Sequence, residues 1–259
     1  MLSRRALFKS TLAACACGLQ HKSFGMEIIR IEDDDVADDD DLPTGGCLLM
    51  PDRSDGLLPV DEIFEAQSAF ATGNSQLDHQ LGVALVRATQ FFGINPAFGF
   101  YKDMNAQASP TVSEKFKGTW GTVLFGTPLF NDEIKNRDPS GMTIVAIVAH
   151  EFGHIIQFKK NLKNQILANQ GTVKRLELHA DILAGYYIGS MKRQHPGLKV
   201  YSAGEVFHRI GDSHFTSPNH HGTPEERKTA SQFGFEYGKN GNMTLDQIVG
   251  AGMNFVSQM

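Results

Sequence analysis

Two short polar motifs, each with two side chains four positions apart, constrain the fold of this chain most strongly. The first, His150-Glu151-Phe152-Gly153-His154, lies in the apolar stretch 143–158, and the second, Glu177 to Asp181, lies in the apolar stretch 176–184. Positions i and i+4 of an α-helix share one face and lie about 6 Å apart along the axis. Two helices joined by the polar break between these stretches can therefore bring both polar faces together. The sequence predicts a fold organised around this helix pair.

The residue types in the two motifs are typical of a zinc site. Zinc accepts imidazole nitrogen at about 2.0–2.1 Å, so His150 and His154 can both reach one ion. Glu177 would complete three protein ligands and leave the fourth position for water, as in catalytic zinc sites. Asp181 would accept a hydrogen bond from the second ring N–H of one histidine and fix its tautomer. We therefore predict a Zn2+ cofactor held by the three ligands.

Two residues between these positions are predicted to have other roles. Glu151 lies about 100° around the helix from His150, where it can reach a water at the metal and act as a general base. His179 points about 160° away from Glu177 and Asp181, so we expect it not to be a ligand. A solvated helix face is the alternative for the second motif, but the interleaved apolar residues favour burial, and buried carboxylates need a partner.

Hydrophobic periodicity and capping residues predict a helix-rich chain with few strands. The helix that starts near Asn74 has apolar residues around most of its circumference, so we expect it to be well buried. Asp138 followed by Pro139 indicates the start of the helix that carries the first motif. The predicted helices are 60–70, 75–92, 138–162, 172–193, 203–210, 224–237 and 244–256, and the predicted strands are 97–101 and 121–126.

The first 25 residues predict that the protein is exported. Arg4 and Arg5 precede a short apolar segment, in a pattern that resembles a twin-arginine signal peptide. Removal of residues 1–25 would give a periplasmic or extracellular protein. There are two alternatives. Residues 12–15 resemble a lipoprotein box, which would place a lipid anchor at Cys15, and a cytosolic protein can carry a chance arginine pair.

An acidic segment separates this region from the rest of the chain. Residues 32–41 hold eight acids and no base, so residues 26–56 are predicted to be a solvated, disordered linker, with calcium binding as the alternative. The chain from Leu42 onward has 19 bases and 20 acids, which excludes the basic surface of a nucleic-acid-binding protein. No apolar run reaches about 18 residues, so no membrane span is expected. Three cysteines are too few for a disulfide-stapled fold.

Taken together, the two motifs resemble those of the gluzincin-type zinc metallopeptidases, in particular the bacterial neutral zinc metallopeptidases and other minimal gluzincin domains. Residues 105–108 resemble the segment that leads into the strand bordering the cleft in such folds, and residues 210–212 and 221–227 resemble two downstream elements. The resemblance implies a helix-rich α+β, zincin-like domain over residues 57–259, with a small sheet over the two metal-binding helices. It also implies hydrolysis of a protein or peptide substrate, with Glu151 passing a proton to the leaving amine.

A zinc peptidase also needs a hydrogen-bond donor for the oxyanion. His221 is the leading candidate because it lies in a polar, turn-rich stretch downstream of Glu177. The alternative for His221 is a structural position before a helix whose Thr223 and Glu226 form a capping box. Arg227 is expected to bind a carboxylate rather than the substrate. Other candidates for the donor are His220, Tyr186, Tyr187 and Tyr201.

Two further function classes are compatible with the sequence. The domain could be a non-catalytic, zinc-bearing scaffold or binding protein of the cell envelope, although a scaffold does not need a base at Glu151. The chain could also act as an adhesion protein through its acidic segment, with a structural zinc ion. Structural zinc sites are usually closed by cysteine or histidine, and Cys47 is the only cysteine outside residues 1–25.

Overall fold

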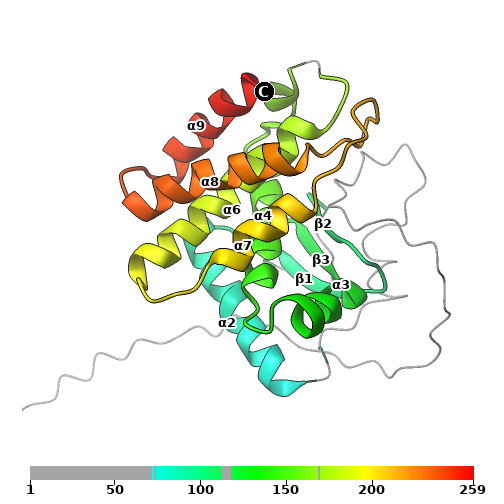
Figure 1. Ribbon diagram of the computed structural model, residues 1–259, viewed down its shortest axis with the longest axis vertical. Helices are drawn as coiled ribbons and strands as arrows, with labels where there is room; N and C mark the ends of the chain where they lie inside the picture. The colour runs from blue at the N-terminus through cyan, green and yellow to red at the C-terminus, as the bar shows by residue number, and fades with distance from the viewer. Residues whose placement is uncertain (1–71, 73, 112–117, 169) are drawn as a thin grey trace, which may run out of the picture.

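The computed structural model describes residues 72, 74–111, 118–168 and 170–259 (Figure 1). The predicted signal peptide, the acidic segment and the predicted helix 60–70 lie outside these residues. The described chain is a helix-rich α+β fold with one three-stranded sheet, which confirms the predicted fold class at this level. Among the described residues, no helix combines the length and the apolar character that a membrane span requires.

The sheet has the strand order β1-β3-β2, with β1 (Ala97–Tyr101) parallel to the central β3 (Thr122–Gly126). The third strand, β2 (Ala106–Ser109), pairs antiparallel with β3. Two of the three strands were predicted. Residues 105–108 were expected only to lead into a strand, but four of the small and polar residues in this region form β2 itself. Pairing with β3 therefore decides the conformation of β2, because β propensity depends strongly on context.

The central helix of the fold is α4 (Met142–Lys159), which packs against the sheet and against α6 and α7. Its residues from Met142 to Gln157 are buried with the single exception of Val145, as expected for a helix that is apolar on all sides. The predicted start at Asp138 is wrong, because Gly141 has a φ of +76° and the helix begins after it. The Asp138 carboxylate instead accepts a hydrogen bond from the backbone N–H of Thr143 at 3.0 Å.

The remaining helices follow the predicted order, with three additions. The predicted ones are α2 (Ser75–Phe92), α6 (Lys174–Gln194), α7 (Tyr201–Arg209), α8 (Pro224–Asn240) and α9 (Leu245–Ser257). Three short elements were not predicted: α3 (Thr127–Asp132), the π-helical turn η1 (Glu133–Arg137) and α5 (Lys163–Leu167). The expected burial of α2 is only partly correct. One face is buried, but Val83 is 37% exposed and Val86 is 50% exposed.

Glycines bring the backbones of α6 and α8 into direct contact. A β-carbon on Gly234 of α8 would lie 1.9 Å from the carbonyl oxygen of Ile182, and one on Gly185 of α6 would lie 2.0 Å from that of Ser231. Gly189 and Gly238 are equally restricted. Figure 1 shows α8 lying along α6, on the side where α9 also packs. This close contact fixes α6 relative to α8 and so helps to position the polar residues of α6.

Candidate metal centre

The candidate metal centre forms where α4 and α6 approach each other closely. Gly153 of α4 faces Ala180 of α6, and a β-carbon on Gly153 would lie 3.1 Å from the Ala180 Cα atom and 3.2 Å from its Cβ atom. The missing side chain of Gly153 therefore permits the close approach. As a result, Glu177, in the first turn of α6, lies beside His150 and His154 of α4.

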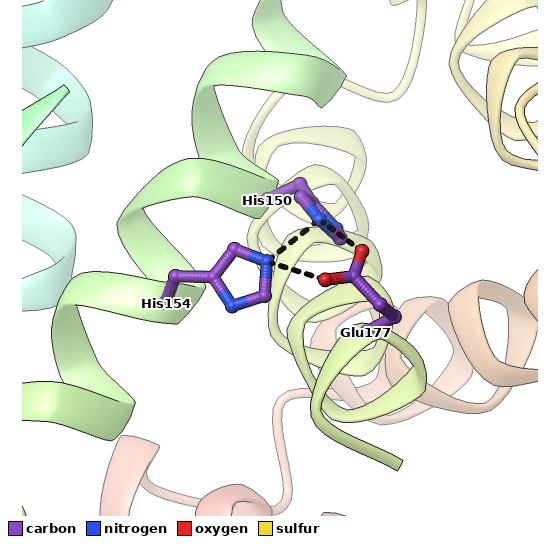
Figure 2. A group of neighbouring side chains, drawn as sticks. All are labelled: His150, His154 and Glu177. Carbon is purple, nitrogen blue, oxygen red and sulfur yellow. Dashed lines mark hydrogen bonds and ion pairs between the residues drawn. The ribbon is translucent and has the colours of Figure 1, made fainter. Parts of the chain in front are cut away.

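The three side chains converge on one point from two helices (Figure 2). His150 Nε2 lies 3.0 Å from His154 Nε2, and the two carboxylate oxygens of Glu177 lie 3.3 Å and 3.4 Å from these same nitrogens. Ligands at about 2.0–2.1 Å in a tetrahedral arrangement are about 3.3–3.4 Å apart. The donor spacing thus fits a tetrahedral ion, and this group can hold a metal ion.

The charges around the centre favour a cation between the side chains of His150, His154 and Glu177. Burial alone would raise the pKa of the Glu177 carboxyl, but the neighbouring imidazoles hold this pKa well below its usual value. Burial alone would lower the pKa of His150, but Asp181 and Glu177 raise it to about 9. Both carboxylate oxygens of Glu177 are buried and make no hydrogen bond within the described part of the chain. A divalent metal ion would supply the positive charge that the carboxylates of Glu177 and Asp181 stabilise.

Asp181 of α6 lies beside the imidazole ring of His150. Its Oδ1 atom is 2.8 Å from His150 Nδ1, which leaves Nε2 of that histidine facing the centre. Arg227 of α8 holds the same carboxylate through two hydrogen bonds of 2.8 Å, from Nε to Oδ2 and from Nη2 to Oδ1. The prediction that Arg227 binds a carboxylate is confirmed. This bidentate pair orients Asp181 and, through it, His150.

Gln157 contacts the second histidine and was not predicted. Its side chain is completely buried on α4, and its Oε1 atom lies 3.0 Å from His154 Nδ1. The signal was present in the sequence, because Gln157 follows His154 by three positions and so lies on the same helix face. His179 points away from the three ligands, as expected: its Nε2 atom lies 3.1 Å from the carbonyl oxygen of Val249 in α9. Burial lowers the pKa of His179 to about 4, so the ring is neutral near pH 7.

The predicted base Glu151 directly follows His150 in α4. The residue is 0% exposed, and His150, His154 and Glu177 are each 1% exposed or less. The whole centre is therefore closed to solvent in this conformation.

The segment between α7 and α8 carries the predicted oxyanion donor, His221. Asp212 organises this segment, because its carboxylate accepts hydrogen bonds from the His221 backbone N–H at 2.8 Å and from His220 Nδ1 at 2.6 Å. His221 Nδ1 lies 3.4 Å from Asp212 Oδ2, whereas its Nε2 atom is buried without a hydrogen-bond partner among the described residues. After the ligand imidazoles, His221 is a further neighbour that lowers the pKa of Glu177 against the effect of burial.

The other candidates for the donor are engaged elsewhere or lie on the surface. Tyr186 donates its hydroxyl hydrogen to the carbonyl oxygen of Met243 at 2.6 Å, and Tyr201 is 80% exposed at the start of α7. Tyr187 is buried against Phe91 and Phe92 of α2. The capping box predicted at the start of α8 is also present, so His221 has both a helix-entry position and a buried ring nitrogen.

Comparison of the chain with protein-family models, with curated proteins and with solved structures finds no match in any of the three. Function is therefore inferred from the chemistry of the centre itself.

Proposed function

We propose that this protein is a zinc-dependent peptidase of the gluzincin type, with His150, His154 and Glu177 as the metal ligands. The observation that carries the proposal is the convergence of these three donors from α4 and α6 at distances of 3.0–3.4 Å. A set of two histidines and one glutamate leaves a fourth tetrahedral position free, which is typical of catalytic rather than structural zinc. The export signal predicted in residues 1–25 belongs to the same proposal and places the enzyme outside the cytoplasm.

In this proposal the zinc ion supplies Lewis acidity toward water and the scissile carbonyl. Glu151 accepts a proton from the attacking water and transfers it to the leaving amine, so its carboxylate must alternate between charged and neutral forms. Asp181 and Arg227 keep His150 in the tautomer whose Nε2 lone pair faces the ion. His221 donates an Nε2–H hydrogen bond to the developing oxyanion, and Asp212 fixes the position of His221 from the opposite side.

The burial of Glu151 has a consequence for this mechanism. A substrate carbonyl must lie close to the base and to the ion, so hydrolysis requires a movement that opens the centre. The same burial favours a second candidate function, a non-catalytic protein that carries zinc as part of its scaffold. In that case Glu151 would be a buried structural carboxylate.

Glu151→Gln separates the two candidates. Glutamine keeps the size of the side chain but cannot accept the proton, so the variant should bind zinc normally and lose a factor of about 10²–10⁴ or more in activity. The assay is cleavage of a mixed peptide library followed by mass spectrometry, with the exposed Glu236→Gln as the matched control. Equal cleavage by zinc-loaded wild type and Glu151→Gln would contradict the proposed mechanism. A zinc-loaded wild type that cleaves nothing would favour the scaffold.

A further inference from the structure

The orientation of the Gln157 amide is fixed by a backbone group. Its Nε2 atom lies 2.8 Å from the carbonyl oxygen of Leu176, which can only accept a hydrogen bond, so this atom must be the nitrogen. The other end of the amide, Oε1, therefore faces His154 Nδ1 at 3.0 Å. An amide oxygen only accepts, so His154 must carry its hydrogen on Nδ1. The Nε2 lone pair of His154 is then directed at the metal centre.

The same logic applies to His179 on the other side of Gln157. His179 Nε2 lies 3.1 Å from the carbonyl oxygen of Val249 and must donate to it, while His179 Nδ1 lies 3.1 Å from Gln157 Nε2 and must accept from it. Three hydrogen bonds thus connect α9 to His154 through two completely buried side chains, and a fourth holds Gln157 to the carbonyl oxygen of Leu176. The backbone carbonyls of Leu176 and Val249 can only accept hydrogen bonds, so they leave only one arrangement of hydrogens.

We infer that Gln157 and His179 are positioning residues that hold His154 in its metal-binding tautomer, and that docking of α9 is thereby coupled to metal affinity. The inference rests on the proposed zinc centre. His179 has the residue type of a ligand and lies two positions from Glu177, but its contact with Gln157 gives it the role of orienting that amide. A neutral amide thus does for His154 what the Asp181–Arg227 pair does for His150.

Helix α9 offers a matched pair of substitutions for a test. A β-carbon on Gly252 would lie 3.0 Å from His179 Cδ2 and 3.2 Å from its Nε2 atom, so Gly252→Ala displaces the ring or the helix. A β-carbon on Gly250 would meet no atom within 4 Å. The two variants make the same chemical change on the same helix, two positions apart, but only one of them presses on His179.

The experiment measures zinc affinity of the full chain by competition with a chromophoric chelator. Gln157→Met keeps the volume of the side chain but removes its hydrogen bonds, and we expect zinc binding to weaken by about 10–100-fold. Gly252→Ala should weaken zinc binding several-fold, and Gly250→Ala should not change it. In addition, long-range 1H–15N spectra of the histidine-labelled, zinc-free protein should show the Nδ1–H tautomer of His154 in wild type and a mixture in Gln157→Met, which a merely structural role would not produce.

Zinc affinity of folded Gln157→Met within twofold of wild type, with an unchanged tautomer, would overturn the inference but leave the proposed peptidase intact. If Gln157→Met does not fold, equal affinities of Gly252→Ala and Gly250→Ala would overturn it. A wild type that binds no zinc would contradict the metal centre and this inference together. Because metal binding is read without substrate, an absence of peptide cleavage does not affect the outcome.

Discussion

The two halves of helix α6 use the same face of the helix in different ways. At intervals of four residues, this face carries the carboxylates Glu177 and Asp181 in its N-terminal half, and Gly185 and Gly189 in its C-terminal half. The carboxylates bind polar groups of α4 and α8, whereas the glycines allow the α8 backbone to touch α6 directly. A buried carboxylate costs free energy unless it is paired, whereas close packing of two helix backbones buries no charge. The C-terminal half therefore anchors the helix, and the N-terminal half places the two carboxylates beside the histidines of α4.

The largest loss of stability should come from breaking the ion pairing in the N-terminal half of α6, where Glu177 and Asp181 lie. Arg227 is completely buried, so Arg227→Met would remove the bidentate partner of the buried Asp181 carboxylate and leave it with its contact to His150. Loss of one partner of a buried pair costs about 3–5 kcal/mol. Denaturant unfolding of the zinc-free protein measures this loss. The neighbouring Lys228→Met is the control, because its contact with Glu205 is solvent-exposed and long at 3.9 Å. Equal stabilities of the two variants would contradict the role given to Arg227.

The packing of the C-terminal half of α6 against α8 should be sensitive to the addition of a single methyl group. Gly234→Ala places a β-carbon 1.9 Å from the Ile182 carbonyl oxygen, so the helices must separate. We expect a loss of roughly 3 kcal/mol in the free energy of unfolding. Because separation of α6 from α8 also moves Glu177, zinc affinity should fall as well. A Gly234→Ala variant with wild-type stability would show that α6 and α8 do not pack through their backbones.

The N-terminal half of α6, which carries Glu177 and Asp181, lies beside the segment between α7 and α8. The free energy of unfolding should depend on pH through Asp212 in that segment. Burial raises the pKa of Asp212, but hydrogen bonds from the His221 backbone N–H and from His220 lower it to about 2. The unfolded chain has the higher pKa, so this carboxylate stabilises the fold above about pH 4, and the stabilisation is lost as the pH falls toward 2. The expected contribution is on the order of 2 kcal/mol.

Acid unfolding curves of wild type and Asp212→Asn measure this contribution. The asparagine variant should be less stable than wild type at pH 6 and should lose less stability between pH 4 and pH 2. Asp246→Asn, at a side chain that is 80% exposed, should follow wild type. Parallel curves for wild type and Asp212→Asn would contradict the assigned hydrogen bonds.

The smallest expected effect is a gain of stability rather than a loss. It tests whether glycine is required only at positions where a β-carbon would meet a neighbouring atom. Gly250 lies on the exposed face of α9, and a β-carbon there meets no atom within 4 Å. Alanine should therefore stabilise the helix by about 0.5–1 kcal/mol. Thermal unfolding of Gly250→Ala beside Gly234→Ala gives the comparison directly. Destabilisation by Gly250→Ala would mean that helix propensity is not the relevant term at this position.

What the sequence could predict differs between these regions for a physical reason. The spacing of His150, His154, Glu177 and Asp181 follows from helix periodicity, so the site could be proposed without knowing the fold. Gln157 also lies on the helix face of His154, but glutamine is not a typical metal ligand, and so it was not predicted. The contact between Gly185 and α8 could not be predicted, because it depends on which helix packs against α6.

Short elements were missed for a related reason. Strand β2 has four residues of small or polar type, and α3, η1 and α5 span five or six residues each, too few for periodicity to be recognised. The start of α4 was predicted three to four residues early, because Asp138 and Pro139 match a helix start while the φ of Gly141 is invisible in sequence. The closure of the centre around Glu151 likewise depends on tertiary packing.

The central claim is that His150, His154 and Glu177 together bind one zinc ion, and metal analysis of the purified protein tests it most directly. Wild type should contain one zinc ion per chain after equilibration with zinc and removal of the excess. His154→Ala and Glu177→Gln should each lose most of it, while Glu205→Gln, at a side chain that is 41% exposed, should keep it. Equal zinc content in wild type, His154→Ala and Glu177→Gln, with all proteins folded, would contradict the metal centre and the function proposed from it.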